Sequence, residues 1–174
     1  MLKKFLLICF LLLTSILIGF SAEKPRWVAQ PVYVYIPEYG NMTGYMQKAF
    51  IEWEKKSDEL IRFKFVSKPS NANIKVNFVD HVTNCNSPYA VGCARMSLRA
   101  GHYNNCELDI AMQKKYGEGY RPIENIYGVM LHEIGHAIGL EHSKSPDSIM
   151  YPYDLPTLQY LTEEDINLLF IKYH

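Results

Sequence analysis

The chain has 174 residues, and its 18 basic residues balance its 18 acidic ones, so the net charge is zero. This balance excludes the strongly basic surface that is typical of nucleic-acid binding or of attraction to anionic membranes. The length suits a leader followed by one domain, residues 23–174, with a hydrophobic core of its own and no room for a second domain.

The first 22 residues have the pattern of a secretory signal peptide. Lys3 and Lys4 precede an apolar run over residues 5–20, and the small residues Ser21 and Ala22 end that run. We therefore expect residues 1–22 to be cleaved, leaving a periplasmic or extracellular protein without a membrane attachment. The alternative is an uncleaved anchor, although the run is a little short for a spanning helix.

Three cysteines follow the leader: Cys85, Cys93 and Cys106. In an exported protein we expect one disulfide among them, with the third thiol free or hidden. Three pairings are open, and the sequence does not choose among them. A structural metal site built from these residues is the alternative, but the C-x-x-C spacing for it is missing.

Strands and helices alternate in the first half of the chain. Residues 31–37 are rich in β-branched and aromatic side chains and predict a first strand. Thr43 is predicted to cap a helix. The apolar face of this helix recurs at helical spacing: Met46, Ala49, Phe50 and Trp53. Residues 60–66 and 73–79 alternate apolar and polar side chains, which predicts two half-buried strands.

The middle of the chain contains two loops and two further strands. Residues 80–91 are rich in Asn, Ser and Pro and predict a loop. Residues 92–98 and 106–112 are predicted strands joined across 99–105. A Gly-rich and Tyr-rich turn follows at residues 114–122.

Two helices are predicted in the last third of the chain. The first covers residues 123–140, because an apolar stripe recurs there every four residues. The stripe consists of Ile126, Met130, Ile134 and Ile138. The second helix begins after Thr162, which forms a capping box with Asp165, while Leu161 and Ile166 form a hydrophobic staple.

The stretch from His132 to His142 carries the clearest chemical signal. Residues four apart on a helix share one face, so His132 and His136 can bind one cation. Glu133 is rotated off that line and can reach a metal-bound water without occupying a coordination position. Gly139 can end the helix in a left-handed conformation, which lets His142 return as a third ligand. Three imidazoles and one water form the open arrangement of a catalytic zinc site.

This stretch resembles the metzincin zinc signature, H-E-x-x-H-x-x-G-x-x-H. Ser143 and the later residues Ser148 to Pro152 are similar to the matrixin, or matrix metalloproteinase-like, branch of that clan. The resemblance implies an α+β catalytic domain of the metzincin type. Such a domain has a twisted, mostly parallel five-stranded sheet with an antiparallel edge strand, and three helices.

The resemblance also implies a secreted zinc metalloendopeptidase that hydrolyses internal peptide bonds. His132, His136 and His142 would bind one catalytic zinc ion, and Glu133 would be the general base that activates the zinc-bound water. Met150 would form the Met-turn beneath the histidines without coordinating the metal. These roles are carried over onto the matching residues of this chain.

Substrate recognition is likewise an expectation from the resemblance. In matrixins an extended peptide adds as a strand to the edge strand above the cleft, which corresponds to residues 92–98 here. Tyr151, Pro152 and Tyr153 would line the pocket for the side chain just after the scissile bond. The alternative is that these residues only pack a surface loop. Asp154 falls where the family pattern has a Tyr, so the depth of the pocket stays open.

Vertebrate matrixins also hold a structural zinc ion and calcium near the sheet. His81 and His102 are present here, but the H-x-D pattern and the Asp-Gly pair are missing, so we predict no second zinc. No motif indicates calcium, which stays an open alternative.

We expect a monomer whose partners are protein or peptide substrates. Because no cysteine-switch motif precedes the first strand, restraint by the compartment, by a protein inhibitor or by narrow specificity stays open. Two other functions are the alternatives. One is a membrane-tethered interaction protein, and the other is a non-catalytic, zinc-stabilised binding module. A module of that second kind would be expected to have lost Glu133, which is present in this chain.

Overall fold

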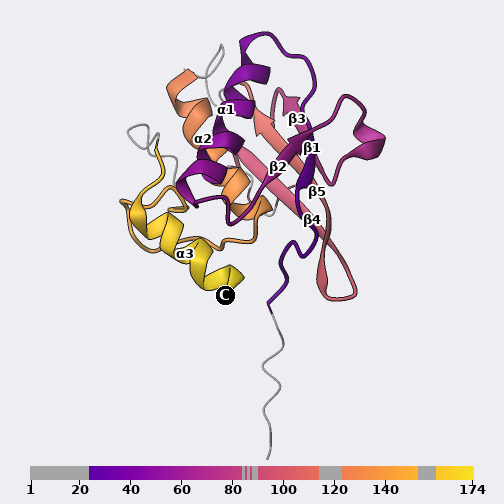
Figure 1. Ribbon diagram of the computed structural model, residues 1–174. Coiled ribbons are helices and arrows are strands. Elements are labelled where there is room, and N and C mark those ends of the chain that lie inside the picture. The colour runs from indigo at the N-terminus through magenta and orange to yellow at the C-terminus, as the bar shows by residue number, and fades with distance from the viewer. Residues whose placement is uncertain (1–23, 84, 86, 88–89, 114–122, 153–159) are drawn as a thin grey trace, which may run out of the picture.

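The computed structural model describes residues 24–83, 85, 87, 90–113, 123–152 and 160–174. The predicted leader and the predicted turn at 114–122 lie outside these residues. In the described part of the chain, one sheet packs against helices that lie on one of its faces (Figure 1). None of the helices described is long and apolar enough to cross a membrane.

The sheet has five strands in the order β2-β1-β3-β5-β4. Neighbouring strands run parallel except for β4 and β5, which are antiparallel and place β4 at the edge. The strands are β1 (Val32–Tyr35), β2 (Phe63–Phe65), β3 (Ile74–Val79), β4 (Gly92–Arg99) and β5 (His102–Ala111). This arrangement confirms the predicted fold class.

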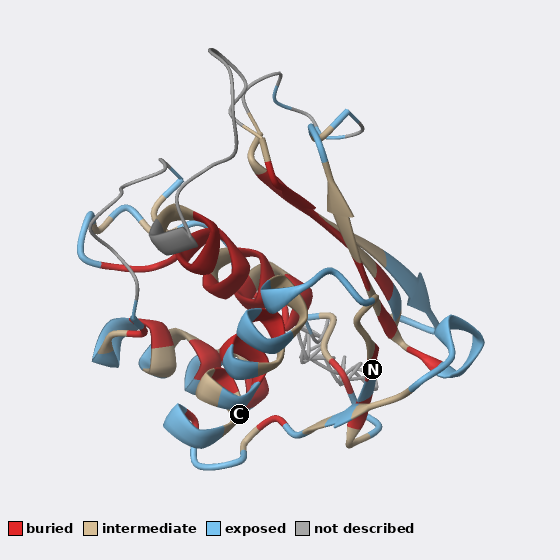
Figure 2. Ribbon diagram, turned by 90° about the horizontal axis from the view of Figure 1, so that it is seen from above, coloured by how far each residue is buried: buried red, intermediate tan, exposed pale blue. Residues whose placement is uncertain are grey.

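Three α-helices accompany the sheet: α1 (Asn41–Lys56), α2 (Ile123–Ala137) and α3 (Glu163–Tyr173). A short 3-10 turn, η1 (Pro69–Asn71), precedes β3. Helix α2 packs against β4 and β5, and α1 packs against α2. Figure 2 shows that the buried residues gather between the helices and the sheet, while exposed residues face outward. The domain therefore has two layers around one core.

The predicted apolar faces of α1 and α2 form this core. Trp53 and Phe50 on α1 are fully buried, as is the predicted stripe on α2. The indole Nε1 of Trp53 donates a hydrogen bond of 2.9 Å to the carbonyl oxygen of Leu131 on α2. This bond satisfies the one polar atom of a large buried ring and ties α1 to the helix that carries the histidines.

The prediction that Thr43 caps α1 is wrong. The helix begins at Asn41, directly after Gly40, which has a φ of 53°. The Thr43 hydroxyl instead accepts a hydrogen bond from the backbone N–H of Tyr39 and donates one to the carbonyl of Pro37. It braces the turn before the helix, because glycine at position 40 lets the chain enter the helix three residues earlier than predicted.

The connection predicted across residues 99–105 is much shorter in the structure. Strands β4 and β5 continue to Arg99 and His102, and only Ala100 and Gly101 form the turn. Both turn residues have positive φ, 52° and 81°, as a tight two-residue hairpin requires. The polar residues at the start of β5 carry no apolar alternation, so the sequence pattern did not reveal this part of the strand.

Candidate active site

An elongated cleft of about 1060 Å³ lies between the edge strand β4 and helix α2. Five residues of β4 line it on one side: the alternating Gly92, Ala94, Met96 and Leu98, and also Cys93. The opposite side is formed by α2, by the chain that follows it and by residues 148–152. The stretch His132 to His142 that the sequence singled out contributes most of this side.

The three histidines of that stretch lie together in the cleft. His132 and His136 project from α2, and His142 approaches them after the chain has left the helix. Their ring centroids are separated by 4.7 Å, 5.3 Å and 4.7 Å for the pairs 132/136, 132/142 and 136/142. One ring nitrogen from each residue lies within 4.8 Å of the other two. Gly139, with a φ of 100°, lets the chain turn back after the helix.

Backbone carbonyl groups fix the orientation of two of these rings. Nδ1 of His132 is 2.6 Å from the carbonyl oxygen of Ile149, and Nδ1 of His136 is 2.8 Å from that of Leu140. A carbonyl only accepts hydrogen bonds, so each Nδ1 carries the proton and donates. Nε2 of each ring is thereby left as a lone pair that can bind a metal.

Burial keeps the same two rings neutral. Desolvation lowers the pKa of His132 to about 3, and nearby His136 adds to this effect. Desolvation also lowers the pKa of His136. Because only the neutral imidazole offers a lone pair, both residues are ready to bind a metal at neutral pH.

The donor set fits a zinc ion. Zinc accepts imidazole nitrogens at about 2.1 Å in a tetrahedral arrangement, so three such nitrogens lie roughly 3.4 Å apart. One ring nitrogen from each of the three histidines lies within 4.8 Å of the other two, near that spacing. The histidines would supply three of the four positions, which would leave one position for a water or a substrate atom.

Glu133 is a buried carboxyl group next to this cluster. Its exposed fraction is 6%, and burial raises its pKa to about 8, while a backbone hydrogen bond with Ala94 acts in the opposite direction. Its Oε2 has no hydrogen-bond partner among the described residues. A side chain at Gly92 would collide with the carboxyl group, so the glycine of β4 makes the space that Glu133 occupies.

Met150 packs directly beneath the histidine-bearing part of α2. It is fully buried, and its sulfur lies where a side chain of Gly135 would be. The backbone N–H of Ser143 donates to the carbonyl oxygen of Met150 at 2.9 Å, which ties the segment after His142 to this turn. Glycine at position 135 is required because the thioether approaches the helix backbone at that point.

A buried carboxylate, Asp165, connects α3 to the turn that carries Met150. It accepts hydrogen bonds from the Ser148 hydroxyl at 2.5 Å and from the Ile149 N–H at 3.2 Å. It also accepts from the N–H and the hydroxyl of Thr162, both at 2.8 Å. The predicted capping box is therefore present, but the same carboxylate also holds the segment whose carbonyl orients His132. The sequence pattern revealed only the capping role.

Tyr151 and Pro152 line the cleft, whereas Tyr153 lies outside the described residues.

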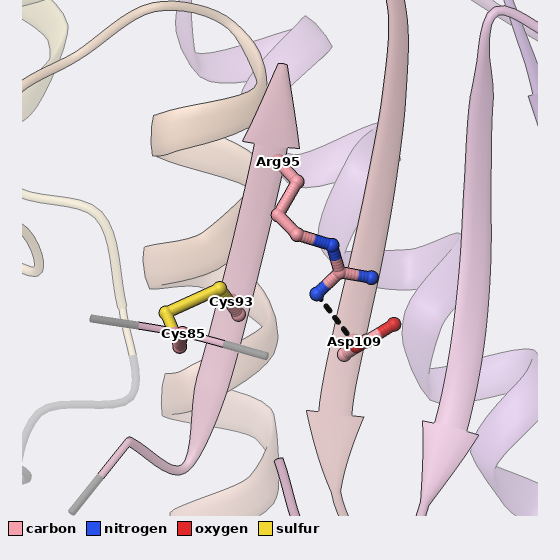
Figure 3. Close-up of a disulfide and its surroundings, with 4 residues drawn as sticks. All are labelled: Cys85, Cys93, Arg95 and Asp109. Carbon is pink, nitrogen blue, oxygen red and sulfur yellow. Dashed lines mark hydrogen bonds and ion pairs between the residues drawn. A yellow bond between two sulfur atoms is a disulfide. The ribbon is translucent and has the colours of Figure 1, made fainter. Parts of the chain in front are cut away.

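Two of the three cysteines also line the cleft. Cys85 and Cys93 form a disulfide at the edge of β4 (Figure 3). The third, Cys106, is a buried free thiol whose pKa is raised by burial.

The outer face of the same strands carries a cross-strand ion pair. Figure 3 shows Arg95 of β4 reaching to Asp109 of β5, 2.7 Å away. Asn77 of β3 donates to the same carboxylate at 2.8 Å. These contacts join the edge strand to the sheet behind the cleft.

Comparison with known proteins identifies the family of this chain. The family model of the matrixins matches residues 36–170. The chain belongs to the matrixin family. The matched range contains the three histidines, Glu133 and Met150, together with strands β2 to β5, helices α1 and α2 and most of α3.

The relatives include viral and mammalian proteins. The chain is 31% identical over 132 residues to a probable matrix metalloproteinase of Invertebrate iridescent virus 3, covering 73% of this chain and 36% of the relative. It is 26% identical over 153 residues to the macrophage metalloelastase of Rattus norvegicus, covering 84% of this chain and 32% of the relative. The chain thus spans about a third of the length of these curated relatives.

Replacing Asp165 with Asn should destabilise the fold and weaken zinc binding. The Asp165 carboxylate accepts four hydrogen bonds, and the NH2 group of Asn would face at least one of these donors and could not accept from it. We therefore expect a loss of about 2 to 4 kcal/mol in the free energy of unfolding. Urea denaturation and zinc titration measure the two effects. Glu163→Gln, an exposed change on the same helix turn, is the control, and equal behaviour of the two variants would contradict the role given to Asp165.

The metal-free protein should lose stability as the pH falls from about 6.5 toward 3. The unfolded chain protonates His132 near its ordinary pKa, whereas the folded protein holds that pKa at about 3, so protons favour the unfolded state within this window. Above pH 6.5 His132 contributes no pH dependence. Urea denaturation in the presence of a chelator at pH 7, 6 and 5 measures how the free energy of unfolding changes with pH. His132 contributes at most about 1.4 kcal/mol per pH unit to this slope. His132→Gln should flatten the slope and His174→Gln should not; an unchanged slope in His132→Gln contradicts the assignment.

Proposed function

We propose that this protein is a secreted zinc-dependent endopeptidase that hydrolyses internal peptide bonds of proteins. One observation carries the proposal: three imidazoles converge in an open cleft beside a buried carboxyl group. Membership of the matrixin family supports zinc as the metal and a peptide bond as the target. The printed names of the relatives, matrix metalloproteinase and macrophage metalloelastase, agree with this class of enzyme.

His132, His136 and His142 would hold the zinc ion through their free ring nitrogens. A zinc ion bound in this way supplies a Lewis acid that polarises a carbonyl group and makes a bound water more acidic. The Nδ1 hydrogen bonds to Ile149 and Leu140 keep the lone pairs of the first two rings directed into the cleft.

Glu133 would move the proton of the attacking water. Its Oε2 has no partner among the described residues and can accept that proton at the start of the attack. The same carboxyl group can then pass that proton to the departing amine. No serine or cysteine nucleophile is needed in this scheme.

The free edge of β4 would bind the substrate. One edge of β4 pairs with β5, and its other edge borders the cleft. An extended peptide can add there as a strand, through backbone hydrogen bonds that do not depend on its sequence. Tyr151 and Pro152 would then line the pocket for the residue just after the scissile bond.

Export is a separate part of the proposal. The basic start, the apolar run and the small residues at positions 21 and 22 favour signal peptidase cleavage near residue 22. A disulfide between Cys85 and Cys93 suits an oxidising compartment.

Replacing Glu133 with Ala should remove nearly all cleavage and leave zinc binding intact. The change removes the base but none of the nitrogen donors, so we expect the rate to fall by about 10² to 10⁴. Digestion of casein and of a peptide library measures the rate, and metal analysis measures zinc. A chelator should also stop cleavage in the unaltered protein, and added zinc should restore it. Glu38→Ala, an exposed change, is the control; full activity in Glu133→Ala would remove the mechanism.

The exported protein should begin near residue 23. Expression of the full chain in a secreting host, followed by intact mass measurement and N-terminal sequencing of the released protein, tests this expectation. A released product that still contains Lys3 and Lys4 would contradict cleavage, and a product found only in the membrane fraction would favour the anchored alternative.

A further inference from the structure

One end of the cleft carries two lysines. Lys24 from the N-terminal segment and Lys172 from α3 both line it, together with Leu98 and Tyr103 of the sheet. Glu141 is the acidic side chain at this end. Neither the zinc site nor the proposed base uses these residues.

Lys172 is held in place by close packing. A side chain at Gly139 would come within 2.8 Å of the Lys172 Cε and within 2.9 Å of the Tyr103 ring, so both side chains lie against bare backbone. The Lys172 Nζ is 5.6 Å from the centroid of the Tyr103 ring, a cation–π contact. The ammonium group is therefore positioned at the cleft wall by its neighbours.

Positive charge is in excess at this end. Burial lowers the pKa of Lys172, and the nearby charge of Lys24 lowers it further, while Glu141 acts in the opposite direction. Two ammonium groups thus face one carboxylate. A further anion between them would relieve the repulsion and replace part of the lost hydration.

The structure also gives the direction of the cleft. Gly92, at the start of β4, lies against Glu133, whereas Tyr103, the partner of Leu98 near the end of β4, lies against Gly139 beyond the end of α2. Strand and helix therefore run the same way along the cleft. Leu98 is four residues beyond Ala94, the backbone contact of Glu133, which corresponds to about 13 Å along a strand.

We propose that Lys24 and Lys172 form a specificity subsite for an acidic side chain, three or four residues before the scissile bond. This inference rests on the proposed endopeptidase function, which places the residue after the scissile bond at Tyr151 and Pro152. The apolar walls, Leu98 and Tyr103, contact the methylene groups of a Glu side chain, while its carboxylate meets the two ammonium groups. A basic side chain at that position is repelled.

The test uses matched peptides that differ at a single position, which carries Glu, Gln or Lys. That position is varied from four residues before the scissile bond to four residues after it. For the zinc-loaded protein, kcat/KM should be highest with Glu three or four residues before the bond. The expected preference over Gln is about two- to fivefold, the range of a partly exposed ion pair, and it should shrink at high salt.

Three variants assign the preference to this end of the cleft. Lys172→Met and Lys24→Met should each reduce it, and Lys172→Glu should turn it toward the Lys peptide. Lys68→Met, an exposed change away from the cleft lining, is the matched control and should keep the full preference. Circular dichroism and zinc content show that each variant is folded and loaded.

Binding separates failure of this inference from failure of the proposed function. Fluorescence anisotropy with the Glu133→Ala protein measures peptide affinity without cleavage. If the unaltered protein cleaves no peptide, the endopeptidase proposal fails, and the affinity for Glu over Gln peptides still decides the subsite. Equal affinity and equal kcat/KM for Glu and Gln peptides, or a preference for Glu only after the bond, would overturn the inference.

Discussion

Two backbone carbonyl groups determine what the histidines of this protein can do. The carbonyls of Ile149 and Leu140 each bind the Nδ1 proton of one imidazole and thereby leave the other nitrogen free. The Ile149 carbonyl belongs to a turn that Asp165 of α3 holds from below. The metal-binding geometry of a helix in the middle of the chain consequently depends on the last helix.

Three glycines let neighbouring side chains approach the backbone closely enough to build the site around the histidines. Gly92 leaves space for the Glu133 carboxyl group, and Gly135 leaves space for the Met150 sulfur. Gly139 combines a positive φ with direct contact to Tyr103 and Lys172. Each glycine brings a different element, namely the edge strand, the Met150 turn and α3, against or close to the helix that carries the histidines.

The sequence predicts the elements of the fold and the chemistry of the site because both have local signals. The apolar spacing on α2 and the H-E-x-x-H pattern each lie within a few turns of one helix. The link from Asp165 to Ser148 joins residues 17 positions apart and has no such signal. The same holds for the cleft end at Lys24 and Lys172, which meet only after the chain has folded. The prediction that Thr43 caps α1 was wrong because a hydroxyl near a helix start can brace a turn as well as cap the helix.

The central claim is that three imidazole nitrogens of this chain bind one zinc ion and leave a position open. X-ray absorption spectroscopy at the zinc edge, on protein loaded with one equivalent of zinc, tests it most directly. The account predicts about three imidazole nitrogens and one oxygen at roughly 2.0 to 2.1 Å, with one imidazole lost in His142→Ala. A sulfur ligand, a closed shell of four protein side chains, or an unchanged spectrum in His142→Ala would contradict it.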